Sequence, residues 1–149
     1  MSRYALAFIL AILVSGCQSG VDRPMTGMDD GGVDRPAANA IANDMTSGLV
    51  EQIGPAENRS IRLDRNGTDY AIALEAALKA WGFIVVGDSP TPETLPKDQE
   101  PMELDHAIDS VDGQALARLT SSTIALARAY TVTATGAVPS SPLSIRRQN

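Results

Sequence analysis

Residues 102–119 read Met-Glu-Leu-Asp-His-Ala-Ile-Asp-Ser-Val-Asp-Gly-Gln-Ala-Leu-Ala-Arg-Leu, and this stretch decides how the C-terminal part of the chain folds. One set of mostly apolar residues, Met102, Leu104, His106 and Ile108, alternates with Glu103, Asp105, Ala107 and Asp109, which is the period of a strand with one buried face. Asp112-Gly113 is the dipeptide typical of a two-residue type I′ turn. The turn and the alternation imply one register, because a slip by one residue would reverse both faces. That register places these residues opposite each other: Ile108 and Ala117, His106 and Leu119, Ala107 and Arg118.

The two faces of this predicted hairpin differ in chemistry. The apolar face holds Met102, Leu104, Ile108, Ala115, Ala117 and Leu119. The polar face holds Asp105, Asp109, Arg118 and Thr120, with Arg118 diagonal to both aspartates. A second turn at Ser121-Ser122 would return the chain as a third strand. This strand would contribute Ile124, Leu126, Tyr130 and Val132, which predicts a three-stranded meander.

Upstream of the hairpin, apolar spacing predicts a first helix over 37–53. Ile41, Met45 and Leu49 recur on one helical face, Pro36 suits the first turn, and Gly54-Pro55 ends the helix. A short strand is then expected over 60–64, with Ile61 and Leu63 pointing inward.

A second helix is predicted over 69–81, with Thr68 as N-cap and Gly82 at the position that favours glycine after a helix. Glu75 and Lys79 are spaced as an i,i+4 ion pair. The apolar stripe ends in Trp81, which we expect to anchor the core. The run 83–86 predicts a buried central strand, and the proline-rich stretch 89–101 predicts an exposed loop. The apolar stripe of the helix predicted over 69–81 comprises Tyr70, Leu74, Ala77, Leu78 and Trp81.

Together these elements predict a small single α+β domain over 37–134, with two helices packed on a mixed sheet that ends in the meander. Residues 17–36 are rich in glycine, proline and aspartate and predict a flexible tether. Residues 135–149 predict an extended tail rich in proline and serine.

The N-terminal segment indicates export and lipid attachment. Residues 1–16 have the basic start and short apolar run of a signal peptide. Leu-Val-Ser-Gly-Cys at 13–17 looks like a bacterial lipobox, and Cys17 is the only cysteine. We therefore expect Cys17 to carry a diacylglyceryl group and an N-acyl chain, with the protein facing the periplasm. The alternative is an ordinary secretory signal with a cysteine near its end.

The composition argues against several function classes. The net charge of −6 disfavours nucleic-acid binding. His106 is the only histidine and lies on the apolar strand face, so we expect it to be a packed, hydrogen-bonded residue. Neither a nucleophile elbow, a metal-ligand cluster nor a phosphate-binding glycine loop is recognisable. We expect no enzyme activity, no cofactor, no metal and no small-molecule substrate, although a periplasmic enzyme that uses His106 remains an alternative.

Several stretches resemble the TrbH family of conjugal transfer lipoproteins. They are GTDY at 67–70, LEAALKAWGF at 74–83, DGQ at 112–114, LARL at 116–119 and PSSPLSI at 139–145. The resemblance implies a role in mating-pair formation within a type IV secretion channel, with other channel subunits as partners. It transfers no catalytic residue, and only the lipidated cysteine maps onto a position, Cys17. Gln18 after this cysteine is compatible with sorting to the outer membrane of a Gram-negative bacterium. A general envelope or peptidoglycan-associated lipoprotein is the alternative.

The C-terminal residues are candidates for docking to a partner. Leu143 and Ile145 are apolar and two residues apart, which suits an added strand. Arg146 and Arg147 form a basic end on an acidic protein and would favour an acidic surface. A terminus without any function is the alternative.

Overall fold

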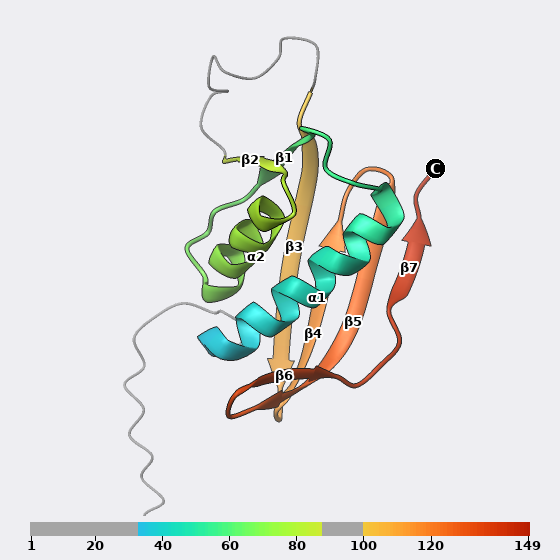
Figure 1. The fold of residues 1–149 in the computed structure, drawn as a ribbon. Helices are drawn as coiled ribbons and strands as arrows, with labels where there is room; N and C mark the ends of the chain where they lie inside the picture. The colour runs from blue at the N-terminus through green and yellow to red at the C-terminus, as the bar shows by residue number, and fades with distance from the viewer. Residues whose placement is uncertain (1–32, 88–99) are drawn as a thin grey trace, which may run out of the picture.

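The computed structural model describes residues 33–87 and 100–149 of the 149-residue chain. Two helices cover one face of a seven-stranded sheet (Figure 1), and within these two ranges no helix lies on the opposite face. Neither helix in these ranges is both long and apolar enough to cross a membrane. The elements are α1 (Arg35–Ile53), β1 (Ser60–Leu63), α2 (Asp69–Ala80), β2 (Ile84–Val86), β3 (Met102–Val111), β4 (Gln114–Thr120), β5 (Ile124–Thr133), β6 (Gly136–Pro139) and β7 (Ser144–Arg147).

The sheet is mixed, with the strand order β2-β1-β3-β4-β5-β6. β1 is parallel to both of its neighbours, whereas all pairs from β3 onward are antiparallel. β6 and β7 pair with different ends of β5, along the edge that β4 leaves free. The predicted α+β class, the two helices and the β3-β4-β5 meander are confirmed.

The predicted hairpin register is confirmed at each of the three named pairs. Asp112 and Gly113 have φ values of 51° and 75°, as a type I′ turn requires. Leu104, Ala117 and Leu119 are almost fully buried against the helices, while Met102 and Ile108 pack at the margin of the core. On the other face, Arg118 forms an ion pair with Asp109, one of the two aspartates predicted for it.

Helix α1 begins two residues before the predicted start. Asp34 adopts an extended backbone and its side chain accepts a hydrogen bond from the amide of Ala37 at 3.1 Å. This N-cap places Arg35 and Pro36 inside the first turn, where proline is tolerated because its position needs no amide donor. Ile41, Met45 and Leu49 are fully buried, as predicted.

Helix α2 follows its predicted caps. The Thr68 hydroxyl accepts a hydrogen bond from the amide of Ala71 at 3.0 Å, and Gly82 has a φ of 91°. Lys79 Nζ lies 2.5 Å from Glu75 Oε1, so the predicted i,i+4 pair is confirmed.

The prediction that Trp81 anchors the core is wrong. Its side chain is 48% exposed, because the helix ends at Ala80 and Trp81 is already the C-cap. The left-handed Gly82 then turns the chain back toward the sheet, and the amide of Phe83 bonds to the carbonyl of Leu78 at 3.1 Å. Phe83 therefore takes the buried position and is only 4% exposed.

The prediction of a central strand over 83–86 is also wrong. β2 is an edge strand, because β1 lies between it and β3. A short apolar run is compatible with a central or an edge strand. Because β3 pairs with the edge of β1 that β2 does not use, β2 remains at the edge of the sheet. Ile84 is accordingly 39% exposed, whereas Val85 faces the core. The loop predicted over 89–101 falls mostly outside the described residues, as do the signal peptide and most of the tether.

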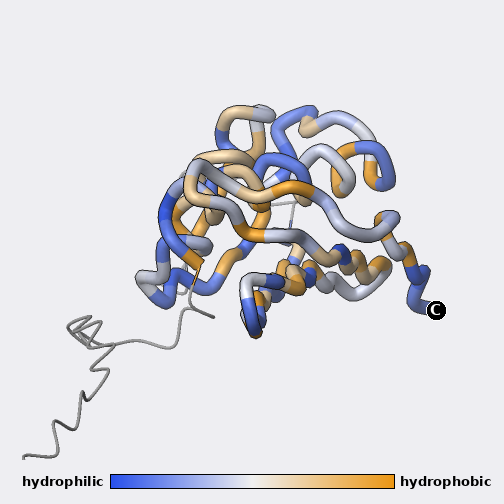
Figure 2. Tube along the Cα trace, turned by 90° about the horizontal axis from the view of Figure 1, so that it is seen from below, coloured by the Kyte–Doolittle hydropathy of each residue, from blue (hydrophilic) through white to orange (hydrophobic). Residues whose placement is uncertain are grey.

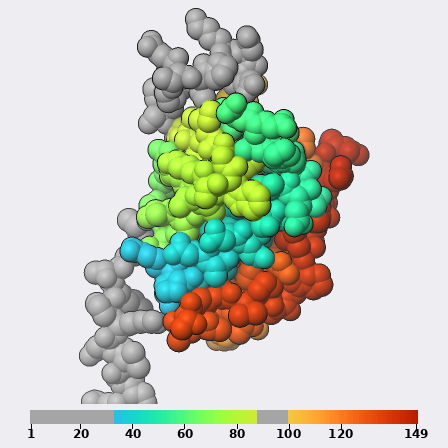
Figure 3. All heavy atoms as spheres, in the orientation of Figure 1, coloured from blue at the N-terminus to red at the C-terminus, as the bar shows by residue number. Residues whose placement is uncertain are grey.

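The C-terminal tail predicted over 135–149 is instead part of the domain. Its residues form β6 and β7 and pair with β5, whose free edge would otherwise expose unpaired backbone groups. β6 also contacts α1, and in Figure 3 the C-terminal residues (red) lie along α1 (cyan). Leu143, between the two strands, packs against the core.

Leu143 meets α1 at Gly48, and this contact yields a stability prediction. A Cβ added at Gly48 would lie 2.7 Å from Leu143 Cδ2. Gly→Ala inside a helix normally stabilises by about 1 kcal/mol. We expect Gly48→Ala to give less than this, or to destabilise, because Leu143 must move. In a Leu143→Ala background the same change should recover the full gain, measured by urea unfolding of all four proteins. Equal effects of Gly48→Ala in both backgrounds would contradict the contact.

Candidate functional site

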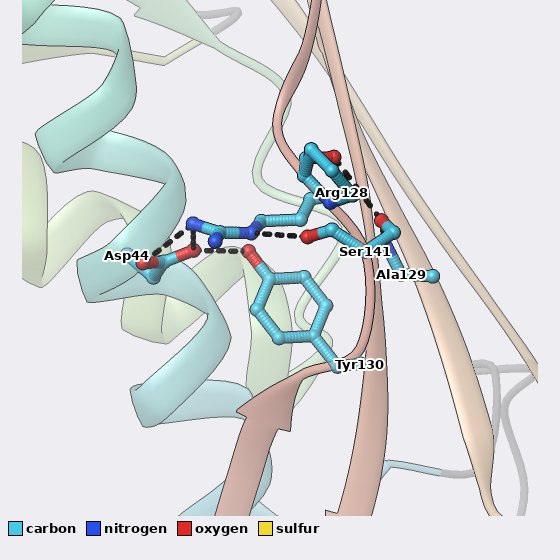
Figure 4. Close-up of polar contacts among 6 residues, drawn as sticks. Asp44, Arg128, Ala129, Tyr130 and Ser141 are labelled. Atoms are coloured by element: carbon cyan, nitrogen blue, oxygen red, sulfur yellow. Dashed lines mark hydrogen bonds and ion pairs between the residues drawn. The ribbon is translucent and has the colours of Figure 1, made fainter.

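A polar cluster joins α1, β5 and the connection between β6 and β7 (Figure 4). Asp44 lies on α1, and Arg128 and Tyr130 lie on β5. Arg128 Nη1 donates to both carboxylate oxygens of Asp44, at 3.2 and 3.0 Å. The Tyr130 hydroxyl donates to Asp44 Oδ2 at 2.6 Å. The Asp44 carboxylate thus accepts hydrogen bonds from a guanidinium and from a phenol at once.

The same arginine also holds the C-terminal segment. Arg128 Nε donates to the carbonyl oxygen of Ser141 at 3.0 Å, and the amide of Ala129 donates to the Ser141 hydroxyl at 2.9 Å. The side chains of Arg128 and Asp44 are 25% and 32% exposed, so their attraction is only partly screened by water. The cluster therefore fixes the position of residues 140–143 relative to the helix.

The cluster is suited to a structural role rather than to proton transfer. Burial, reinforced by the hydrogen bond to Asp44, raises the pKa of Tyr130 well above its ordinary value. Its hydroxyl therefore stays protonated as a donor. The sequence carried a signal for this cluster, since Arg128 occupies an inward position between Leu126 and Tyr130. A charged residue on the buried face of a strand predicts a partner.

His106 is hydrogen-bonded and packed, as predicted, but at the margin of the core. Its Nε2 lies 3.0 Å from the carbonyl oxygen of Asp64, and therefore carries the proton in this contact. Its ring meets the Tyr70 ring edge-on, with centroids 5.7 Å apart. The side chain is only half-buried. In the described ranges, no group of three or more His, Cys, Asp or Glu side chains could hold a metal ion.

The four docking candidates lie on one segment but are not equally accessible. Leu143 is turned toward the core. Ile145 is 44% exposed, and Arg146 and Arg147 are also exposed. Arg147 borders a shallow hollow with Gln52, Ile53 and Gln148 at the end of α1. Cys17, the predicted lipid-attachment site, lies outside the described residues.

The two fully buried tyrosines give a matched pair of substitutions. The Tyr70 hydroxyl has no hydrogen-bond partner among the described residues, whereas the Tyr130 hydroxyl bonds to Asp44. We expect Tyr130→Phe to lower the free energy of unfolding by about 1–2 kcal/mol, because Asp44 loses a donor. Tyr70→Phe should be neutral or stabilising, since it removes an unpaired buried hydroxyl. Chemical denaturation measures both, and equal losses would contradict this assignment.

Comparison with known proteins places this domain in a family. No solved structure matches the chain. The chain is 48% identical to the "Probable conjugal transfer protein TrbH" of Sinorhizobium fredii (strain NBRC 101917 / NGR234), over 149 residues and the full length of both proteins. The family model for conjugal transfer protein TrbH matches residues 20–149, which include every described element. The chain therefore belongs to the TrbH family of conjugal transfer proteins.

Proposed function

We propose that this protein is a lipid-anchored structural component of a conjugative type IV secretion channel, acting in mating-pair formation through contacts with other channel subunits. Membership of the TrbH family is the observation that carries the proposal, and it rests on nearly the whole chain. The proposed site of action is the periplasmic side of the outer membrane.

The proposed anchor is Cys17. A single acyl chain gives only marginal membrane binding, but each buried CH₂ adds about 0.8 kcal/mol. Diacylglyceryl and N-acyl chains on one cysteine would therefore hold the protein at the membrane for its lifetime. Gln18, which follows the cysteine, is consistent with the outer membrane.

The domain supports a role in binding other proteins. Two of its partly buried charges, Asp44 and Arg128, are bonded to each other across the helix–sheet interface. His106 is engaged with a backbone carbonyl. The domain also exposes several large apolar side chains, among them Ile72, Trp81, Val138 and Ile145. Such residues are available for contacts with partner subunits.

The anchor is tested by Cys17→Ser. We expect this variant to lose labelling by an alkyne fatty acid and to keep its signal peptide, because serine does not accept the diacylglyceryl group. Ser19→Ala, which leaves the cysteine in place, is the matched control and should be labelled normally. Undiminished labelling of Cys17→Ser would refute lipid attachment at this residue.

The role in transfer is tested by removing the gene from a conjugative plasmid. We expect transfer to recipients to fall to background and to return when the wild-type gene is supplied in trans. Growth rate and detergent resistance of the donor should not change. A general envelope or peptidoglycan-associated lipoprotein would give the reverse pattern, with weakened envelopes and normal transfer.

A further inference from the structure

The outer edge of β7 presents unpaired backbone groups. The amide of Gln148 donates to the carbonyl of Thr123 at 2.8 Å, so this pair is hydrogen-bonded across the ladder. In an antiparallel ladder such pairs alternate with pairs whose amide and carbonyl groups point away. Along β7, the residues opposite Ile124 and Leu126 are Arg147 and Ile145. Their N–H and C=O groups therefore point outward, and no other strand in the described ranges pairs with β7.

The neighbouring edge strand β6 is less able to accept a further strand. The amide of Ser140 donates to the carbonyl of Ala129 at 2.9 Å, which makes Pro139 an outward-facing residue by the same alternation. Proline has no amide hydrogen and interrupts pairing at an edge. β7 contains no proline, so the end of the chain is the more receptive part of this edge.

The side chains of β7 make its edge basic. Cross-strand partners share a face, so Arg147 lies on the helix-covered face with Ile124, and Arg146 lies on the open face with Ala125. Each of the other arginines in the described ranges has an acidic or backbone partner. Arg146 and Arg147 have none there, in a chain of net charge −6. Figure 2 shows this hydrophilic end of the chain (blue) at the side of the molecule.

These charges discriminate between possible occupants of the edge. Pairing with β7 of a second copy would bring four arginines together, and like charges in cross-strand positions are destabilising. An acidic strand instead gains an opposite charge on each face of the sheet. Ile145, which lies between Ser144 and the two arginines in the strand, is exposed and offers an apolar contact.

We propose that the outer edge of β7 binds an extended acidic segment of another channel subunit as an additional strand of the sheet. The segment would place acidic residues beside Arg146 and Arg147 and an apolar residue beside Ile145. The identity of the partner as a channel subunit rests on the proposed function, whereas the chemistry of the edge does not.

The test uses two synthetic peptides and the full-length protein extracted in detergent. The acidic probe is acetyl-Thr-Thr-Val-Glu-Glu-Val-Thr-Thr-amide, which presents the required order of residues in either strand direction. The control has Lys-Lys in place of Glu-Glu. Hydrogen exchange measured by mass spectrometry should show slower exchange over residues 144–148 with the acidic peptide alone, and added salt should weaken this protection.

Two sets of variants separate backbone pairing from charge. Ile145→Pro removes an outward amide and leaves the hydrogen bonds to β5 intact, whereas Ile145→Ala keeps the amide. We expect Ile145→Pro to weaken acidic-peptide binding at least about fivefold relative to Ile145→Ala. The double variant Arg146→Glu/Arg147→Glu should lose the acidic peptide and gain the basic one, while Arg146→Lys/Arg147→Lys should retain the wild-type preference. Thermal melts verify that each variant is folded.

The proposal is overturned if both peptides bind equally, if the charge-reversed variant keeps its preference for the acidic peptide, or if protection appears away from β7. Protection of 144–148 in the protein without peptide that increases with protein concentration would indicate a second copy and would also overturn it. These results do not depend on plasmid transfer. A normal transfer frequency after gene removal would refute the proposed function and leave the binding property of the edge intact.

Discussion

The register of the β3-β4 hairpin is the constraint on which the rest of the sheet depends. Asp112 and Gly113 both adopt positive φ, which closes a two-residue turn and leaves one way to align the strands. Because side chains alternate with a period of two, a slip by one residue would bring Arg118 to the core and Leu119 to solvent. The same register continues through β4 into β5, where it brings Arg128 and Tyr130 to the face covered by α1.

This register also determines how the first helix is joined to the C-terminal part of the domain. Asp44 comes from the first helix, and Arg128 and Ser141 come from the last third of the chain. Their mutual bonds, together with the contact of Leu143 at Gly48, position β7 along β5. Half-buried ion pairs of this kind contribute modestly to stability but strongly to geometry, because either partner alone would be left without its hydrogen bonds. The basic edge is therefore a property of the folded domain rather than of a free tail.

Predictions from the sequence succeeded where local signals were sufficient. The caps of α2, the pair Glu75–Lys79 and the hairpin pairing all involve residues close in the chain. The predictions from the sequence were wrong for the burial of Trp81, for the central position of β2 and for the C-terminal tail. The first two errors have the same physical origin: exposure of Trp81 depends on Phe83 filling the core, and the position of β2 depends on which edge of β1 receives β3. These competitions occur between segments that periodicity treats independently.

The sequence by itself determined the fold class, the meander register and the resemblance to the TrbH family, because alternation, turn chemistry and caps act over a few residues. Only the tertiary structure decided that residues 136–139 and 144–147 belong to the sheet. Proline and serine make that segment a poor strand in isolation, and its pairing is stabilised by the free edge of β5 and by bonds to Arg128. That pairing also directs the backbone N–H and C=O groups of Ile145 and Arg147 toward the open edge. An unpaired tail would have no inward or outward side.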